Sequence, residues 1–259
     1  MTLLELSSAI KAGRVPRPRV FVALGVEASL ALAQSSVQAP VLSALIPRSG
    51  FARVLRLAEL KASSNFTALY LDLPLGRQLA LIALALPKAR RLGVLLGPES
   101  GARLPMLKTA AAANGLTVVD ARIESTQDLF PALKQVLAES DVLLAMADPE
   151  VFNSNSIQNI LLSAFRAKVP MVGFSPAYVR AGALLGLYVT PAQVGRQVAN
   201  LVIEVVQDKP LPGSPLESRD FEVGVNEPVA RALGLDLKAS VLRQDLQDIN
   251  GSQDKKRLP

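Results

Sequence analysis

Short apolar runs alternate along this chain with longer segments whose apolar residues have helical spacing. The apolar runs, rich in Val and Leu, lie at Arg19–Leu24, Val41–Leu45, Ala68–Leu71, Leu92–Leu96, Leu116–Val119, Val142–Met146, Met171–Phe174 and Ala183–Tyr188. Helical spacing occurs at Leu75–Leu86, Leu104–Ala113, Leu129–Leu137, Ile157–Phe165 and Val194–Val206. Uninterrupted apolar strands separated by helices predict parallel sheets covered on both faces. We therefore expect an α/β fold with doubly wound parallel sheets.

Polar residues follow several of these predicted strands. The stretch DVLLAMADPEVFNSNS (Asp141–Ser156) passes from a buried strand directly into a polar turn, and Gly25, Pro47 and Ser175 follow three other strands. Ligands of open parallel sheets bind outside the carboxyl ends of the strands, so these turns predict a ligand site. Every α/β sheet needs turns there, and the pattern alone leaves a purely structural role open.

The composition removes most catalytic chemistry. The 259 residues include no Cys, His or Trp, which excludes disulfides, thiol nucleophiles and imidazole-based triads or zinc sites. No DxD or ExxE cluster appears, so we expect no metal and no cofactor. Ser175 lies in GFSPA, which departs from the G-x-S-x-G nucleophile elbow. Carboxylates, Lys, Ser or Tyr would have to carry any catalysis.

The charge does not indicate a nucleic-acid partner. The net charge is +6, but the basic residues are scattered in small groups such as Lys88, Arg90 and Arg91. Aromatic residues are only 4% of the chain and do not interleave with these groups, which are typical of solvated helix ends. The hydrophobic fraction of 50% suffices for a core, while no apolar stretch reaches the roughly 18 residues of a membrane span.

The order of signals from Asn65 to Pro212 resembles the ABC transporter substrate-binding proteins of the aromatic amino-acid-binding type, which have the type I periplasmic-binding fold. The matching stretches are LPLGRQLALIALALPKARRLGVLLGPES, DVLLAMADPEVFNSNSIQNILLSAFRAKVPMVGFSPAYVRAGALLGLY and VGRQVANLVIEVVQDKPLP. They include a helix ending in Pro87, the polar turn with Asp148, the pair Gly182-Ala183 and the helix with Gly195-Arg196-Gln197. ALGVEA and SALIPRSGF resemble the first-lobe turns that face the ligand.

The resemblance implies two α/β lobes that trap a small molecule in a cleft between them. Lobe one would comprise residues 1–73 and 189–237, with Phe221–Asn226 as a further strand, and lobe two residues 74–188. The charged residues 238–259 would form a C-terminal tail that frays. Asp208–Asp220, with its Pro, Gly and Ser residues, is expected to be an exposed connector.

The resemblance also implies the ligand-binding residues. In lobe one they are Gly25, Val26, Glu27, Ile46 and Pro47, and in lobe two Asp148, Pro149, Asn153, Phe174, Ser175 and Tyr178. Family members usually have Asp at the position of Ile46.

Structural alternatives stand beside these roles. Gly25 serves either a tight turn or, with the amides of Val26 and Glu27, a ligand carboxylate at a positive helix end; the acidic Glu27 would oppose an anion unless it points away or meets an ammonium group. Asp148 is either a helix cap before Asn153 or a ligand for a cationic or hydroxyl group. Phe174 fits a core, and Tyr178 could stack on a ligand. Salt bridges or a bidentate carboxylate contact are the alternatives for Arg77, Arg180 and Arg196.

The implied function is the substrate-binding component of an ABC uptake system, which captures an amino acid or related metabolite for a membrane permease without catalytic turnover. A cytoplasmic sensor or regulator of the same fold is the main alternative. A sugar-isomerase or nucleotide-sugar enzyme would need an acid–base pair that the sequence does not show.

The first residues predict a chain that begins late. Leu3–Pro16 has the pattern of a helix, which in this fold follows a strand that the sequence lacks, and Met1–Glu5 lacks the features of a secretion signal. A start further upstream would imply a periplasmic protein, and the sequence as given leaves a cytoplasmic one open. An incomplete lobe one would expose a strand edge that favours a homodimer.

Overall fold

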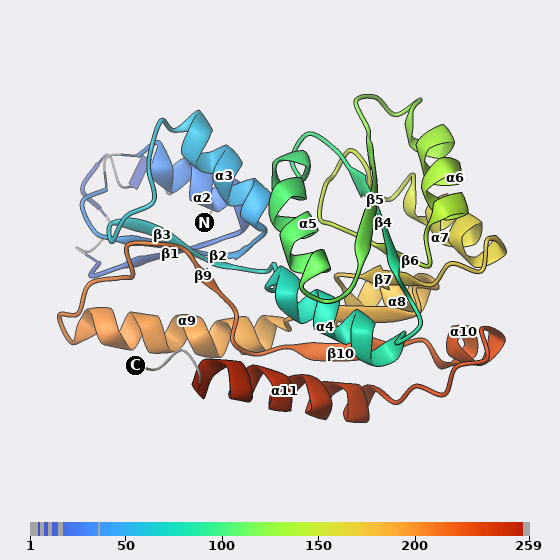
Figure 1. Cartoon of the computed structure of the whole chain (residues 1–259). Helices are drawn as coiled ribbons and strands as arrows, with labels where there is room; N and C mark the ends of the chain where they lie inside the picture. Colours follow the sequence, from blue (N-terminus) through green and yellow to red (C-terminus); the bar gives the residue numbers. More distant parts are fainter. Residues whose placement is uncertain (1–4, 6–7, 10–11, 15–17, 36, 256–259) are drawn as a thin grey trace. The chain divides into compact units, whose positions relative to one another are not determined.

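The computed structural model describes all residues except 1–4, 6–7, 10–11, 15–17, 36 and 256–259. The chain divides into two compact units (Figure 1). Unit 1 contains Met1–Asp72 and Val189–Phe221, and unit 2 contains Leu73–Tyr188 and Glu222–Pro259. The helix expected over Leu3–Pro16 falls largely outside the described residues.

Unit 1 is built on a four-stranded parallel sheet in the order β1-β2-β3-β9. The strands are β1 (Phe21–Leu24), β2 (Val41–Ile46), β3 (Phe66–Tyr70) and β9 (Leu216–Glu217). Helices α2 (Gly25–Ala33) and α3 (Arg48–Leu57) follow the first two strands, and α9 (Pro191–Val206) also belongs to the unit.

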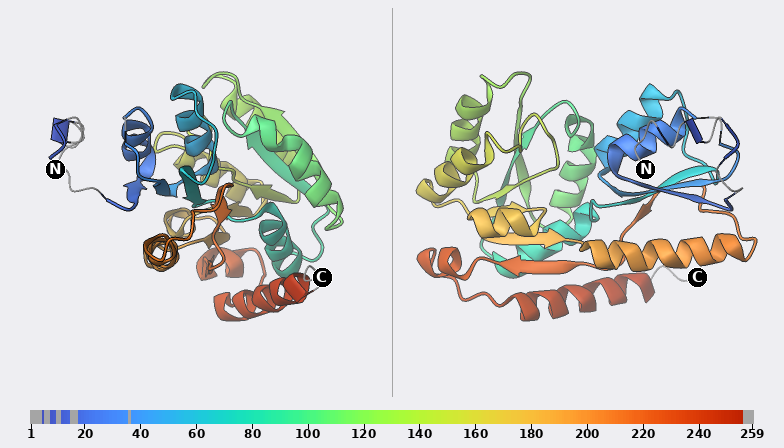
Figure 2. Two further views of the ribbon diagram at one scale, coloured as in Figure 1. Left: turned by 90° about the vertical axis from the view of Figure 1, so that its left-hand side faces the viewer. Right: turned by 180° about the vertical axis from the view of Figure 1, so that it is seen from behind.

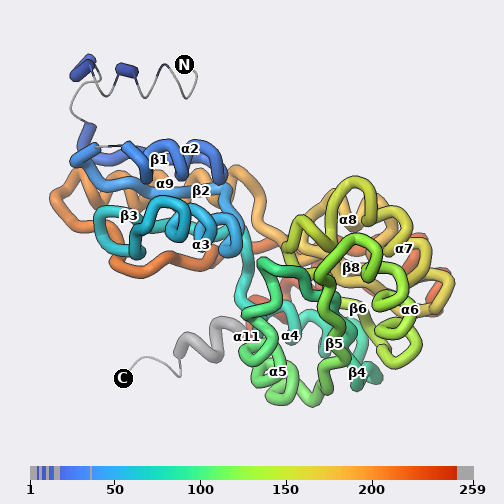
Figure 3. Tube along the Cα trace, turned by 90° about the horizontal axis from the view of Figure 1, so that it is seen from above, coloured from blue at the N-terminus to red at the C-terminus, as the bar shows by residue number. Residues whose placement is uncertain are grey.

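Both faces of this sheet are covered by helices. Successive residues of a strand point to opposite sides, so the residues of β2 are divided between two apolar clusters. Val41 and Ile46 pack with Phe51 of α3, whereas Leu42 and Ala44 pack with residues of α9 such as Val194. Figure 3 shows α9 beneath β1 and β2, with α2 and α3 on the other side of the sheet. This two-sided covering explains why the strands read as uninterrupted apolar runs.

Unit 2 contains a six-stranded sheet in the order β10-β8-β7-β6-β4-β5. Its strands are β4 (Arg91–Leu96), β5 (Thr117–Arg122), β6 (Val142–Leu144), β7 (Met171–Gly173), β8 (Leu185–Tyr188) and β10 (Glu222–Val225). Its helices are α4 (Leu75–Ala85), the 3-10 turn η1 (Gly101–Arg103), α5 (Leu104–Ala112), α6 (Leu129–Glu139), α7 (Ile157–Arg166), α8 (Pro176–Ala181), α10 (Glu227–Ala232) and α11 (Ala239–Lys255). Residues of α6 and α7 form one apolar core with Leu95, Leu143 and Met171 of the sheet.

The strand at the end of this sheet corrects one expectation. We expected Phe221–Asn226 to supply a strand of lobe one, but β10 pairs with β8 of unit 2, with Val223 opposite Leu187. The pairing is antiparallel, unlike the parallel pairs of the other strands in this sheet. The apolar residues of β10 showed that it is a strand, but such a short run carries no information about its partner.

The end of the chain corrects a second expectation. Instead of a frayed tail after Leu237, the chain forms α11, which packs against α4 and β10 (Figure 2). Leu242 and Leu246 are buried, and they lie four residues apart, on the same face of the helix. The exposed side of this helix carries polar residues such as Gln244, Asp245 and Asp248. The high content of charged residues therefore concealed the apolar face when only the composition was considered.

Candidate functional site

The predicted site residues lie at the carboxyl ends of parallel strands in each unit. In unit 1 they lie in the turns from β1 into α2 and from β2 into α3, and in unit 2 they follow β6 and β7.

Gly25 makes the tight turn from β1 into α2 in unit 1. Its φ of +82° is a left-handed conformation that L side chains rarely adopt, so the turn itself requires glycine. The preceding Leu24 has no polar side chain to cap the helix, and Glu27 is exposed in its first turn. The turn therefore presents the positive end of α2, partly offset by an acidic side chain.

The first turns of α2 and α3 meet at Gly50. A β-carbon on Gly50 would lie 2.7 Å from Cγ2 of Val26 and 3.3 Å from Cγ of Pro47. The structure thus brings Val26 and Pro47 to the same glycine. Ile46, by contrast, has an exposed fraction of 0% and packs in the core of unit 1. Its side chain is not available to a ligand, which corrects the prediction for this position.

Arg48 organises a polar cluster beside this surface that the sequence reasoning did not identify. Its guanidinium lies 4.5 Å from the centre of the Tyr70 ring and forms an ion pair with Glu217. Its backbone N–H donates a 2.6 Å hydrogen bond to Oδ2 of Asp72. Burial raises the pKa of the Tyr70 phenol above its ordinary value. The sequence showed only that a basic residue lies two positions after the core strand β2. It could not show the partner of Arg48, because Glu217 lies 169 residues away.

Asp148 in unit 2 fastens two loops together. Its carboxylate accepts hydrogen bonds from the backbone N–H groups of Glu99 (3.0 Å) and Ser100 (2.8 Å), and from the Ser100 hydroxyl (2.8 Å). The N–H of Glu150 donates a fourth, at 3.1 Å. The residue is only 2% exposed. The carboxylate is thus occupied by groups of the protein itself. It neither caps a helix nor is presented to a ligand, which were the two roles considered for it.

The polar residues after Asp148 are also used within their own loop. Asn153 donates from Nδ2 to the carbonyl of Pro149 at 2.8 Å, and its Oδ1 accepts from the N–H groups of Asn155 and Ser156. The buried Ser156 hydroxyl donates to the carbonyl of Val151 at 2.6 Å. Much of the hydrogen-bonding capacity after β6 therefore builds a self-supporting loop, while Pro149 is exposed at its surface.

Three aromatic rings cluster beside this loop. The ring centres of Phe174 and Tyr178 are 4.6 Å apart, and Phe152 lies 6.4 and 6.5 Å from them. Phe174 and Tyr178 are partly exposed, whereas Phe152 is buried. Burial raises the pKa of the Tyr178 phenol to about 12. We call Phe174 and Tyr178, with Phe152 behind them, the aromatic surface of unit 2.

Ser175 and Gly173 hold this surface in place. The Ser175 hydroxyl caps α8 by accepting a hydrogen bond from the N–H of Tyr178. A β-carbon on Gly173 would lie 2.7 Å from Cβ of Tyr178, so only glycine lets the tyrosine approach the strand. Ser175 therefore has a structural role at the edge where we predicted a ligand contact.

The arginines considered as carboxylate ligands lie on three different helices. Arg196 of α9 pairs with Asp220 across 3.8 Å, which agrees with the salt-bridge alternative. Arg77 lies on α4 and Arg180 in the last turn of α8.

A separate groove of about 790 Å³ opens in unit 2 near the amino ends of β4, β6 and β7. Its lining includes Leu86, Lys88, Leu137, Lys168 and Leu233. Within the part of the chain that the structure describes, none of the predicted ligand residues lines it.

Neither a metal cluster nor a membrane-spanning helix occurs among the described residues. Their His, Cys, Asp and Glu side chains form no group of three or more that could hold a metal ion. No helix in the described ranges has the length and apolar character needed to cross a membrane.

Comparisons with known proteins agree with the resemblance noted in the sequence. A conserved domain protein from Vibrio cholerae O1 biovar El Tor is 24% identical with a TM-score of 0.65, covering 93% of this chain and 80% of its own. The ABC domain in complex with L-Trp from Streptococcus pneumoniae is 20% identical with a TM-score of 0.64, covering 93% and 84%. An open, ligand-free substrate-binding protein with adhesive properties from Clostridium difficile is 20% identical with a TM-score of 0.71, covering 92% and 80%.

These structures confirm the predicted two-lobe α/β fold. No relative is found among the curated proteins. The sequence model described as "ABC transporter substrate binding protein" matches residues 4–248, which is most of the chain. The chain therefore belongs to the ABC transporter substrate-binding protein family.

Proposed function

We propose that this substrate-binding protein captures an amino acid or a related small metabolite, and that the aromatic surface of unit 2 holds its apolar part. The observation that carries the proposal is the pair of partly exposed rings of Phe174 and Tyr178 at the carboxyl ends of the unit 2 strands. Aromatic rings gain about 0.5–1.5 kcal/mol from stacking or edge contacts beyond the burial of their area. The complex of the S. pneumoniae relative with L-Trp supports this ligand class.

The charged end of the ligand would be bound by unit 1. The N-cap residues of α2 and α3, Leu24 and Pro47, provide no side-chain cap, although Asp72 accepts a hydrogen bond from the N–H of Arg48. Arg48 and Glu217 supply one positive and one negative side chain. An α-amino acid carries both charges, so it could pair its carboxylate with Arg48 or a helix end and its ammonium group with Glu217 or Glu27. The turn residues Gly25, Val26 and Pro47 would shape this part of the site.

Capture would follow from closure of the two units on one ligand. A ligand shifts a conformational equilibrium only by the difference in its affinity for the two states. A molecule that contacts both units has such a difference, because half of its contacts exist only when both are engaged. We propose that an ABC permease then recognises the closed form, and that the protein works outside the cytoplasm, as family membership supports.

The absence of Trp from the chain gives a direct binding test. Indole fluorescence excited near 295 nm would come from added L-tryptophan, so its change on binding can be titrated without background from the protein. A panel of other amino acids and small metabolites would be tested by their effect on the melting temperature. A ligand at 100 times its dissociation constant adds about 2.7 kcal/mol to the stability.

The variants Phe174→Ala and Tyr178→Ala should weaken binding of the ligand found in this panel by at least about tenfold, or about 1.4 kcal/mol. Phe130→Ala is the matched control, since Phe130 is a partly exposed ring that lies on α6 and not in the segments after β6 and β7. Equal affinities in all three variants would refute the assignment of this surface.

We further propose that the protein does not transform its ligand. The chain has neither imidazole nor thiol, and the carboxylate of Asp148 is occupied by four donors. Ligand recovered after prolonged incubation should be chemically unchanged by mass spectrometry. Steady conversion of the ligand by the wild-type protein would overturn this proposal.

A further inference from the structure

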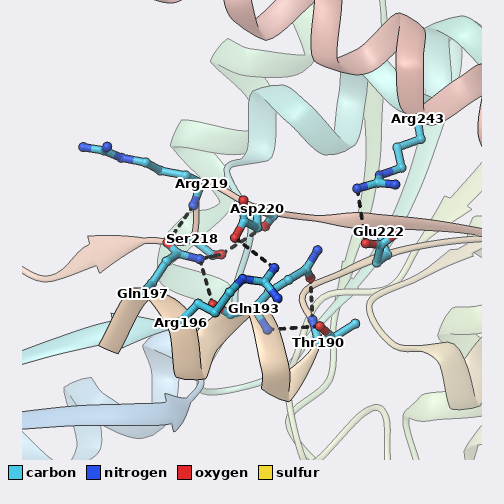
Figure 4. Close-up of polar contacts among 9 residues, drawn as sticks. All are labelled: Thr190, Gln193, Arg196, Gln197, Ser218, Arg219, Asp220, Glu222 and Arg243. Carbon is cyan, nitrogen blue, oxygen red and sulfur yellow. Dashed lines mark hydrogen bonds and ion pairs between the residues drawn. The ribbon is translucent and has the colours of Figure 1, made fainter. Parts of the chain in front are cut away.

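The chain passes between the two units at three places, between Asp72 and Leu73, Tyr188 and Val189, and Phe221 and Glu222. Residues beside the second and third passages are held by polar side chains of α9 within unit 1 (Figure 4). Changes in the orientation of domains are absorbed by a few residues at such connections. The contacts that restrain these residues therefore decide where the backbone can rotate.

Gln197 uses both ends of its side-chain amide on the connector that precedes the third passage. Nε2 donates a 2.8 Å hydrogen bond to the hydroxyl of Ser218, and Oε1 accepts a 3.1 Å bond from the N–H of Arg219. The Ser218 hydroxyl in turn donates to the carbonyl of Asp220 at 3.0 Å. We call this set of contacts the Gln197 clamp, and it restrains three consecutive residues.

The Ser218 end of the Gln197 clamp is buried. Ser218 is 1% exposed, so its hydroxyl would lose a partner without replacement by bulk water if the Gln197 amide were removed. Arg196 adds an ion pair to Asp220 across 3.8 Å, but both side chains are largely exposed, and such pairs contribute little. The amide of Gln197 therefore restrains the connector through a buried partner, whereas the ion pair of Arg196 adds little.

The second passage is restrained from the same helix. Thr190 and Gln193 form a reciprocal capping box in which the N–H of Gln193 donates to the Thr190 hydroxyl at 3.2 Å and the N–H of Thr190 donates to Oε1 of Gln193 at 2.9 Å. Gln193 is itself buried. The start of α9 thus fixes the chain immediately after Tyr188–Val189, while the clamp fixes it immediately before Phe221–Glu222.

We propose that Gln197 is a positioning residue for ligand capture, because its clamp limits backbone rotation at the third passage to Phe221–Glu222. Without the clamp, the flexible stretch would extend back to Ser218. Ligand binding would then have to order more residues, which costs conformational entropy and weakens affinity. The effect on affinity rests on the proposed function, whereas the restraint of the connector does not.

Amide hydrogen exchange tests the restraint in the ligand-free protein. Gln197→Ala should accelerate exchange at residues 218–220, most of all at the N–H of Arg219. Alanine is at least as good a helix former as glutamine, so α9 itself should be unaffected. Asn200→Ala, at an exposed position of the same helix, is the matched control and should leave exchange unchanged. Equal exchange at residues 218–220 in both variants would overturn the proposal.

A distance measurement tests the consequence for the two units. Because the chain has no cysteine, spin labels can be placed at Glu204→Cys in unit 1 and Gln135→Cys in unit 2, both exposed helix positions. The distance distribution from electron–electron double resonance should broaden when Gln197→Ala is added, and should not change with Asn200→Ala. An unchanged distribution would contradict a positioning role.

Affinity for L-tryptophan as the probe completes the test. Gln197→Ala should weaken it about tenfold, equivalent to about 1.4 kcal/mol, while Asn200→Ala leaves it unchanged. Ser218→Ala, which keeps the bond from Arg219 to Gln197, should give a smaller loss and serves if Gln197→Ala folds poorly. Unchanged affinity in a variant whose connector exchanges faster would refute the role in capture. If the wild-type protein does not bind L-tryptophan, the ligand found in the panel of amino acids and metabolites replaces it as the probe. The exchange and distance measurements decide the clamp in either case.

Discussion

Asp148 lies so close to the backbone of Gly97 that a β-carbon at position 97 would be 2.4 Å from Oδ1 and 2.6 Å from Cγ of the aspartate. Gly97 directly follows β4, and its N–H donates a 3.0 Å hydrogen bond to the Ser100 hydroxyl, which also bonds to Asp148. The loop after β4 and the loop after β6 are therefore fitted to one another without room for another atom.

This contact predicts that Gly97→Ala destabilises the protein. Overpacking of a close contact costs about 1–3 kcal/mol, and displacing the carboxylate would also weaken its hydrogen bonds. Gly101→Ala is the control, since a β-carbon at position 101 would have no atom within 4 Å and no strained backbone angle is involved. Urea unfolding should show a lower midpoint for Gly97→Ala alone, and equal midpoints would contradict the close packing.

Asp148→Asn should be destabilising although it preserves the size of the side chain. An amide NH₂ group cannot accept the hydrogen bonds that the carboxylate receives, and a hydrogen bond to a charged group contributes about 1.5–3 kcal/mol. We expect a loss of at least about 2 kcal/mol by the same reasoning. Asp128→Asn provides the comparison, because Asp128 accepts similar bonds from Ser125 at an exposed position. A loss no larger than that of Asp128→Asn would show that burial of Asp148 does not matter.

The pair formed by Asp141 and Arg91 predicts a contribution to stability that disappears in acid. The hydrogen bond from Arg91 to the carboxylate lowers the pKa of Asp141 from 3.8 to about 2. The unfolded chain therefore takes up a proton first, so this contribution is complete above about pH 4 and declines as the pH falls towards 2. Urea midpoints of wild type and Asp141→Asn should differ slightly at pH 6 and converge by pH 2. A constant difference would refute this origin.

Tyr178 predicts a contribution to stability that disappears in alkali. Burial keeps its phenol protonated to about pH 12 in the folded protein, whereas an unfolded tyrosine ionises near its ordinary value of 10.0. The stabilisation is therefore complete below pH 10 and is lost as the pH rises towards 12. Because the pKa of the Tyr70 phenol is also raised, the absorbance titration of phenolate near 295 nm is made in a Tyr70→Phe background. There Tyr178→Phe should remove the late step and Tyr188→Phe should leave it, and the opposite result would assign the step to Tyr188.

The C-terminal helix should be part of the stable core of unit 2. Leu246→Ala removes a fully buried side chain and should cost about 2–5 kcal/mol. Val241→Ala, on the exposed side of the same helix, should change the stability by less than about 0.5 kcal/mol. Equal unfolding midpoints for the two variants would indicate that the helix contributes nothing to folding.

The sequence predicted the fold well because doubly covered parallel strands leave a strong signal. The runs predicted at Val41–Leu45 and Leu92–Leu96 lie within β2 and β4, where the structure buries most of their residues, and helices with clear spacing follow them. The turns after strands were also located correctly, since a strand buried on both faces must end where polar residues begin.

The roles of individual polar residues could not be predicted in the same way. The donors to Asp148 at Glu99 and Ser100 precede it by 49 and 48 residues, and Glu217 reaches Arg48 across 169 residues. Nothing local distinguishes a carboxylate that will meet backbone N–H groups from one that will meet a ligand. The pairing of the short strand β10 with β8 and the packing of α11 against α4 could not be predicted for the same reason, because the partners lie far away in the sequence.

The division of the chain into non-contiguous units has a consequence for its synthesis. Unit 1 receives α9 and β9 from residues 189–221, after all of Leu73–Tyr188 has been made, and unit 2 receives β10 and α11 later still. Chains emerge from the ribosome at about 5–20 residues per second, so the sheet of unit 1 must wait about ten seconds, with the face that α9 will cover still exposed. A nascent chain stalled near residue 190 should therefore depend on chaperones to stay soluble, whereas one released beyond α11 should not.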